Sequence, residues 1–212
     1  INSIANICEH LGADVRVVAD AIGRDPRIGN QFLQPGPGFG GSCFPKDTIG
    51  LVRLAEEAGY DFGVLKSVIE ANNQQLDRTV AKVETAVGGT LAGAKVAVWG
   101  LTFKAHTDDR RHSPAIEVTR RLIAAGASVS AYDPTVSGSI PELPELAVAS
   151  GAVAACAGAA ALVVLTEWPE FAEADPAEAL GAMAAPAVVD ARNLLDSGAW
   201  RSAGFAYTGT GF

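Results

Sequence analysis

A cysteine inside a glycine-rich segment is the residue of this sequence best suited to do chemistry. Residues 38–47 read G-F-G-G-S-C-F-P-K-D, and the glycines let the backbone pass close to a ligand in conformations that other residues avoid. Pro45 and Asp47 suit the first turn of a following helix, which puts Cys43 at or just before the N-terminus of that helix. There the helix macrodipole and the neighbouring Lys46 favour the thiolate, the form of cysteine that attacks carbon. Cys43 is therefore predicted to be a nucleophile; the alternative is a buried cysteine beside a tight turn.

The elements around this cysteine are predicted to be helical. Residues 1–86 contain no convincing strand, and we expect them to form one helical domain. One helix should end at Gly59, and another should run from about residue 64 towards Val83. At the start of the chain, apolar residues at three- and four-residue steps predict one helical face made of Ile4, Ile7, Leu11, Val15 and Val18.

The rhythm changes in residues 87–212, where short apolar runs alternate with helical patterns. This alternation predicts an α/β fold, with the helical segment followed by a Rossmann-like parallel sheet and flanking helices. Ligands of such a sheet lie beyond the carboxyl ends of its strands. The predicted strands are residues 95–100, 128–132, 160–165 and 187–190.

The first strand-to-helix turn lacks the glycine fingerprint of dinucleotide-binding sheets. Gly100 is followed by L-T-F-K, so no glycine path leads a pyrophosphate onto the N-terminus of the next helix. No other part of the chain supplies such a path. The sheet is therefore predicted to bind a nucleotide without being a site for NAD.

Composition and charge exclude several classes of protein. The 212 residues carry a net charge of -8, and no basic block exists to neutralise the phosphates of a nucleic acid or an anionic membrane. No apolar run approaches the ~18 residues that span a bilayer, and no signal peptide is found. The 3 cysteines have no metal-type spacing, which predicts free thiols, no metal site and a cytoplasmic location.

Five separated motifs resemble one known enzyme family, in that family's order. They are G-N-Q-F-L at 29–33, the segment 38–47, G-L-T-F-K with T-D-D-R-R-H-S-P within 95–114, A-Y-D-P at 131–134, and T-E-W-P-E-F at 166–171. Together they are similar to the central and UDP-binding domains of the UDP-glucose/GDP-mannose dehydrogenase family. The resemblance covers essentially the whole chain.

The resemblance implies an activity and a cofactor. The enzyme would oxidise UDP-glucose to UDP-glucuronate with NAD, in two hydride transfers. A cysteine thiolate adds to the intermediate aldehyde, forming a thiohemiacetal and then a thioester that water hydrolyses. The resemblance also implies a homodimer, formed through the helical domain.

The resemblance assigns roles to individual residues as well. Cys43 corresponds to the nucleophile, and Asp47, which can share its side of the helix, helps to activate the water. Arg111 matches an arginine near the NAD pyrophosphate. The nucleotide sugar is expected to contact Arg27, given across a dimer interface, and Phe32, Leu33, Phe39, Gly40, Lys104 and Arg192.

The chain also departs from the family pattern. Asn2 looks like the asparagine of an N-E pair, but Ser3 replaces the glutamate, and a lysine expected further upstream is absent. The N-terminal NAD-binding domain is absent too. Because the chain begins without Met and already in helical rhythm, we expect it to be a piece of a longer protein.

Three other interpretations stay open at this stage. The substrate could be GDP-mannose or UDP-N-acetylmannosamine. The isolated chain could be a non-catalytic module that binds a nucleotide sugar and dimerises. A thiol redox protein built on Cys43 is disfavoured, because no resolving cysteine lies nearby.

Overall fold

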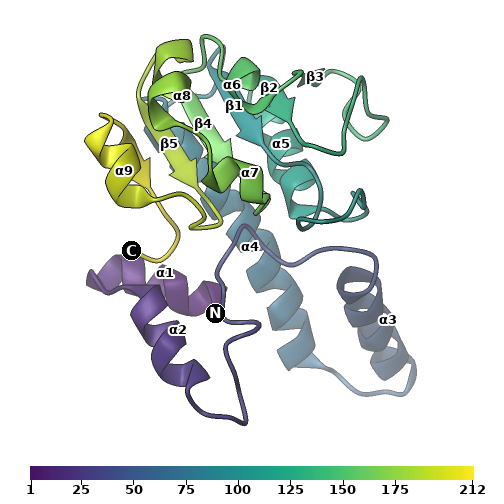
Figure 1. The fold of residues 1–212 in the computed structure, drawn as a ribbon. Coiled ribbons are helices and arrows are strands. Elements are labelled where there is room, and N and C mark those ends of the chain that lie inside the picture. The colour runs from purple at the N-terminus through teal and green to yellow at the C-terminus, as the bar shows by residue number, and fades with distance from the viewer.

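The computed structural model describes residues 1–212 and places a group of helices below an α/β sheet (Figure 1). The 4 helices that precede the sheet in the sequence are α1 (Asn2–Leu11), α2 (Val15–Gly23), α3 (Phe44–Glu57) and α4 (Gly63–Ala86). The glycine-rich loop connects α2 to α3. This arrangement confirms a helical segment followed by an α/β sheet.

The sheet is parallel throughout, with its 6 strands in the order β3-β2-β1-β4-β5-β6. The predicted α/β class is therefore correct, and so are the 4 predicted strands. The sequence pattern missed β3 and β6, because runs of 2 and 3 residues are too short to show a periodicity. The strands are β1 (Lys95–Trp99), β2 (Ser128–Tyr132), β3 (Ala147–Val148), β4 (Ala161–Val164), β5 (Ala187–Asp190) and β6 (Ala206–Thr208).

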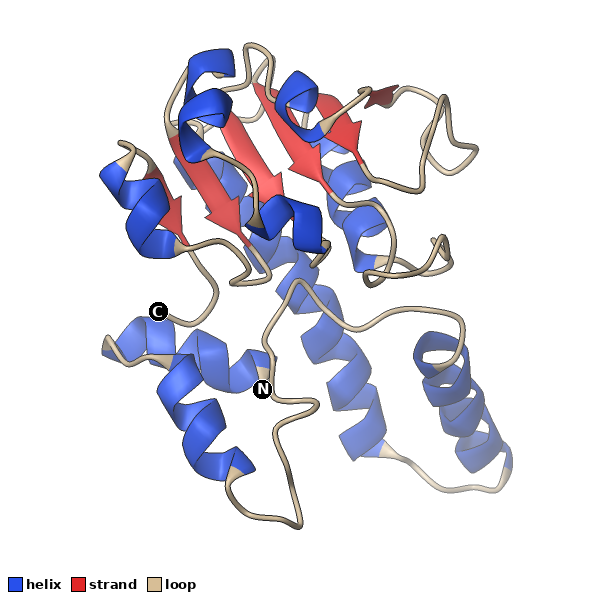
Figure 2. Ribbon diagram, viewed as in Figure 1, coloured by secondary structure: helices blue, strands red, loops and turns tan.

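Helices cover both faces of the sheet, as Figure 2 shows. On β1, Val96 and Val98 face the core formed with α4 and α5, while Ala97 and Trp99 face the opposite core. A strand buried on both faces has no polar side to show, which is why this run reads as continuously apolar. The flanking helices are α5 (Pro114–Ala124), α6 (Ala152–Ala155), α7 (Pro169–Ala172), α8 (Pro176–Ala182) and α9 (Ser197–Ser202).

The long helix α4 joins the two parts of the molecule (Figure 1). Its Leu76 and Val83 are buried in the core beneath the sheet, whereas Val64 and Val68 near its start are exposed. A boundary between the parts at residue 86 stays a prediction. Because α4 contributes Leu76 and Val83 to the core of the sheet, the two parts share buried side chains on the N-terminal side of this boundary.

The expected single helical face at the start of the chain is wrong. Gly12 ends α1 in the left-handed conformation (φ 66°), and Asp14 begins α2 by accepting a hydrogen bond from the Arg16 amide. The regular apolar spacing therefore runs across two helices. In α1 it is Ala5 and Cys8 that are buried, while Ile4, Ile7 and Leu11 are 37, 53 and 77% exposed.

The chain returns to the helical segment after β6. The Gly211 amide donates to Glu9 Oε1 (2.7 Å), and the Gly211 carbonyl accepts from the Val15 amide (2.9 Å). Lys82 of α4 donates to the Gly209 carbonyl at 2.8 Å. These contacts fix α1 and α2 against the sheet. No helix is both long and apolar enough to cross a membrane.

Candidate functional site

Cys43 lies at the N-cap of α3, as the sequence predicted. Its thiol is exposed, and Pro45 lies in the first turn of the helix. The Asp47 amide donates to the Cys43 carbonyl at 2.9 Å, so the cysteine backbone is the start of the helical hydrogen-bond pattern. Cys43 therefore lies at the positive end of the α3 dipole, a position that is common among nucleophilic cysteines.

Two cations lie within electrostatic range of Cys43. Lys46 pairs with Asp47 Oδ1 at 2.8 Å, and this hydrogen bond, with a smaller contribution from the charge of Cys43, raises the pKa of Lys46. Asp109 in the same way raises the pKa of Arg111, and Cys43 contributes there too. Both cations therefore feel the charge of the thiol, although Arg111 is distant in sequence. The fold brings three predicted site residues together: Cys43, Asp47 and Arg111.

Amide side chains hold the glycine-rich loop in place. The Gly36 amide donates to Asn2 Oδ1 (2.9 Å), and the Gly36 carbonyl accepts from Gln75 (3.0 Å). Asn72 bonds both the amide and the carbonyl of Phe39, at 2.8 and 3.1 Å. Sequence reasoning missed Asn72 and Gln75. The available signal was the polar run N-N-Q-Q at residues 72–75 of an otherwise amphipathic helix.

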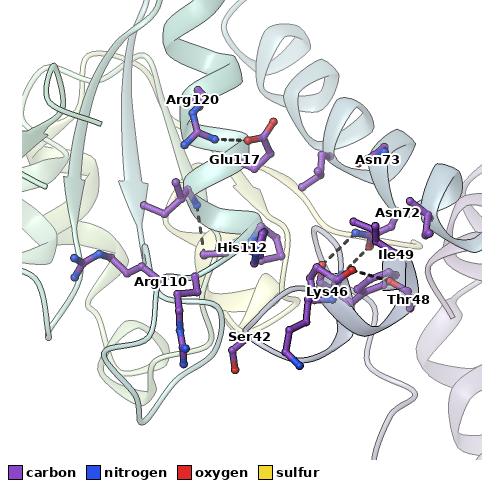
Figure 3. A pocket seen from close by; sticks show the side chains of 18 of the residues that line it. Ser42, Lys46, Thr48, Ile49, Asn72, Asn73, Arg110, His112, Glu117 and Arg120 are labelled. Atoms are coloured by element: carbon purple, nitrogen blue, oxygen red, sulfur yellow. Dashed lines mark hydrogen bonds and ion pairs between the residues drawn. The ribbon is translucent and has the colours of Figure 1, made fainter. Parts of the chain in front are cut away.

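The loop passes directly over the N-terminus of α5. A Cβ on Gly40 would lie 2.2 Å from the His112 carbonyl oxygen and 2.5 Å from Pro114, so only glycine allows this approach. Beside this contact is a cavity of about 860 Å³ between α3, α4 and α5. Figure 3 shows Lys46 on the α3 side of the cavity and Arg110 in the loop before α5.

The carboxyl ends of β1 and β5 contribute a second group of side chains. Lys104 is exposed, with its Nζ 5.3 Å from the centre of the Phe103 ring. Arg192 is largely buried: its Nη2 donates to the Phe103 carbonyl (3.2 Å) and its Nε to that of Leu165 (2.8 Å). Burial lowers the pKa of Arg192, and the charges of Glu167 and Asp190 oppose this shift. These bonds orient Arg192 towards the glycine-rich loop.

Arg192 meets the loop at a smaller cavity of about 400 Å³, which Phe32, Gly36 and Phe39 also line. Leu33 lines a neighbouring hollow that reaches the same arginine. Arg27 stands apart: it is 87% exposed and pairs only with Asp25, at 2.5 Å. Phe32, Leu33, Phe39 and Arg192 thus meet where the loop approaches the sheet, whereas Lys104, Gly40 and Arg27 line neither of these two cavities.

No three histidine, cysteine or carboxylate side chains gather so as to hold a metal ion. The arrangement offers an exposed thiol at a helix N-terminus, two cations beside it, and a carboxylate one turn into the helix. Such a set suits addition of a thiolate to an electrophilic carbon near an anionic ligand.

Native chain treated with iodoacetamide at about pH 8 is expected to be modified at Cys43 only. Cys8 is 4% exposed, and burial raises the pKa of Cys156 to about 12. At that pKa only about one Cys156 thiol in ten thousand is ionised. Peptide mass mapping measures the adducts, and its sites should become three in denaturant. Modification of native Cys156 should rise only as pH approaches 12; comparable labelling of Cys8 or Cys156 at about pH 8 would contradict the assignment.

Comparison with known proteins assigns the class of this chain. Residues 1–74 match the central domain, and residues 97–197 the UDP-binding domain, of the UDP-glucose/GDP-mannose dehydrogenase family. The chain belongs to this family of nucleotide-sugar oxidoreductases.

Individual relatives agree with this family. A UDP-glucose 6-dehydrogenase, TuaD of Bacillus subtilis (strain 168), is 50% identical over 142 residues, which is 67% of this chain and 30% of the relative. The UDP-glucose 6-dehydrogenase of Rhizobium meliloti (strain 1021) is 49% identical over 63% of this chain and 31% of its own length.

Solved structures are similar over all of this chain. A UDP-glucose dehydrogenase from the archaeon Pyrobaculum islandicum superposes with a TM-score of 0.84 and 32% identity, over 100% of this chain and 46% of that protein. An NDP-N-acetyl-D-galactosaminuronic acid dehydrogenase from Methanosarcina mazei Go1 gives a TM-score of 0.88 and 25% identity, over 100% and 46%. The chain thus spans less than half the length of these relatives.

Proposed function

We propose that this chain is the catalytic-cysteine and nucleotide-sugar-binding part of an NAD-dependent dehydrogenase that oxidises UDP-glucose to UDP-glucuronate. The observation that carries the proposal is Cys43, exposed at the N-terminus of α3 within a loop that also contacts the UDP-binding domain. Identity of about 50% to UDP-glucose 6-dehydrogenases supports this substrate.

Each residue near the thiol has a part in the proposed chemistry. The Cys43 thiolate adds to the carbonyl carbon of the sugar aldehyde, holding it as a thiohemiacetal that is later oxidised to a thioester. Asp47, one turn into α3, orients the water that hydrolyses the thioester. Lys46 and the positive end of the α3 dipole provide a cationic environment for the attacking sulfur.

NAD does not fit the sheet of this chain. The turn after β1 lacks the second and third glycines of a dinucleotide site, and the acid that follows β2, Asp133, is completely buried. When bound by another part of the enzyme, NAD would accept the hydrides. In this chain we assign only Arg111, 70% exposed beside the thiol, to the pyrophosphate.

The substrate side is assigned to the second group of residues. Lys104 and Arg192 would contact the nucleotide sugar from the sheet, and the loop would contribute Phe32, Leu33, Phe39 and Gly40. Arg27 is too isolated in one copy of the chain, so we assign it to the sugar site of a second copy. Exposed Leu51 and Leu54 on α3 support a dimer. The three free cysteines support a cytoplasmic location.

A non-catalytic role is a second candidate for the chain by itself. Its sheet offers no fit for NAD, so the isolated chain would bind a nucleotide sugar and dimerise without oxidising it. Related enzymes act on other sugars: a UDP-N-acetyl-mannosamine dehydrogenase from Staphylococcus aureus has a TM-score of 0.74 and 26% identity over 99% of this chain. The nucleotide sugar is therefore to be measured directly.

A calorimetric titration of this chain is expected to show binding of UDP-glucose and little binding of GDP-mannose. Replacement of Lys104 by alanine should weaken UDP-glucose binding about tenfold, because a charge-assisted contact contributes roughly 1.5 kcal/mol. Lys95→Ala is the matched control, since Lys95 is an exposed lysine at the start of β1, whereas Lys104 lies in the turn that follows the end of β1. Preference for GDP-mannose would overturn the substrate, and equal losses in both variants would overturn the role of Lys104.

A further inference from the structure

A buried carboxylate holds the turn that carries Phe103 and Lys104. Asp133 follows β2, the strand beside β1, and is 0% exposed. No lysine, arginine or histidine pairs with it; all its hydrogen-bond donors are neutral. A buried charge without a counter-ion is costly, so its surroundings must have been built to retain it.

The two oxygens of Asp133 connect three loops at the carboxyl edge of the sheet. Oδ2 accepts from the Leu101 amide at 2.8 Å, from the Thr102 amide and hydroxyl at 3.1 Å each, and from the Trp168 indole at 3.1 Å. Oδ1 accepts from the amide and hydroxyl of Thr135, at 3.0 and 2.8 Å. Burial by itself would raise the pKa of Asp133, but the backbone donors hold it below its ordinary value. The carboxylate is thus an acceptor fully used by the protein.

The far side of the same turn is also fixed. The Thr102 carbonyl accepts from Thr166 Oγ1 at 2.7 Å, and the Phe103 carbonyl accepts from Arg192 at 3.2 Å. Asp133 therefore accepts hydrogen bonds from the start of the turn, and Arg192 donates one to the Phe103 carbonyl further along it. Between them, the Lys104 side chain is left exposed.

Asp133 occupies the position after the second strand at which a dinucleotide-binding sheet carries its ribose-binding acid. In a dinucleotide-binding sheet, the acid after the second strand points outward to a ribose, and glycines of the first turn bring the backbone to the pyrophosphate. Here the acid points inward and binds the first turn itself. The turn then offers side chains, Phe103 and Lys104, rather than bare backbone.

We propose that Asp133 is a positioning residue for nucleotide-sugar binding, acting through the turn that presents Phe103 and Lys104. This inference rests on the proposed function of Lys104. Asp133 touches no ligand in this scheme. Its carboxylate fixes the turn conformation in which the Lys104 side chain is exposed beside the Phe103 ring.

The decisive experiment is a double-mutant cycle on the 212-residue chain, with UDP-glucose affinity measured by calorimetry. Asp133→Asn keeps the shape of the side chain, but it replaces one carboxylate oxygen by an amide NH2 group, which donates and would face the N–H groups that now donate to Asp133. It should weaken binding about tenfold or more in the wild type. In the Lys104→Ala background the same substitution should weaken binding much less, because the group it misplaces is already gone. An equal loss in both backgrounds, or wild-type affinity in folded Asp133→Asn, overturns the proposal.

Amide hydrogen exchange gives a readout that needs no ligand. The Phe103 amide donates to the Asp109 carbonyl (3.1 Å) and not to Asp133, so it reports the turn itself. Its exchange should accelerate about tenfold or more in Asp133→Asn. If wild-type chain binds no UDP-glucose, the proposed function fails for this chain, and exchange alone decides: unchanged Phe103 exchange overturns the positioning of the turn, and faster exchange supports it.

Two further variants separate positioning from general stability. Phe205→Leu loosens the core beside β6, where the ring centres of Phe205 and Trp200 are 4.7 Å apart. This variant should leave the affinity for UDP-glucose and the exchange of the Phe103 amide unchanged. If it weakens binding as much as Asp133→Asn, the effect is general and the proposal falls. If Asp133→Asn does not fold, Trp168→Phe removes one donor to Asp133 and should shift both readouts in the same direction, about threefold; no shift overturns the proposal.

Discussion

Replacing Cys43 by alanine is expected to lower turnover by about three orders of magnitude or more in an enzyme that joins this chain to an NAD-binding domain. Cys43 carries the one thiol at the N-terminus of α3, and the nearby Lys46 and Arg111 are cations, which cannot replace it. Without a covalent link the aldehyde is free to leave before the second oxidation. Formation of NADH and of UDP-glucuronate measures the loss.

The control for this variant is Cys8→Ala. Cys8 lies on α1, is 4% exposed and packs with Ala5 and Val15, away from the glycine-rich loop. Its replacement should therefore leave turnover within about twofold of the wild type. A Cys43→Ala enzyme that still forms the carboxylate at a comparable rate would show that the thiol does no covalent work. The proposed mechanism would then be wrong even though the family is right.

Replacing Gly100 by alanine is expected to lower the free energy of unfolding by at least about 3 kcal/mol. Gly100 has a φ of 94°, and a Cβ there would lie 2.3 Å from Thr166 Cβ. The energy of the backbone strain and that of the steric overlap add, because Gly100 directly follows β1 and Thr166 follows β4. Neither residue can move without disturbing its strand. A total stability of roughly 5–15 kcal/mol makes this a large fraction. Urea unfolding measures it.

Gly12→Ala is the matched control for this stability prediction. Gly12 also has a positive φ, 66°, but a Cβ there would meet nothing within 4 Å. Strain alone should then destabilise the chain by about 1 kcal/mol. Equal losses for the two variants would mean that the contact with Thr166 relaxes freely, and the turn after β1 would be less constrained than the structure indicates.

The local sequence determined where the candidate nucleophile Cys43 lies and most of the fold. The position of Cys43 at a helix N-terminus follows from the adjacent Pro45 and Asp47, and the strands follow from apolar runs that are buried on both faces. Signals of this kind act over a few neighbouring residues, so they can be read without a structure. The same reading failed for α1 and α2, because a regular apolar spacing does not reveal that Gly12 and Asp14 interrupt the helix.

Tertiary structure alone decided which distant groups meet. Three contacts join segments that are far apart in the chain. Arg111 lies within electrostatic range of Cys43, Asn72 is hydrogen-bonded to Phe39, and Asp133 accepts from the turn after β1. No local propensity encodes such meetings, because they depend on how α4 and α5 pack and on which strands become neighbours. The residue types of the site could thus be found in the sequence, whereas their mutual orientation arises from the packing of the sheet and the helices around it.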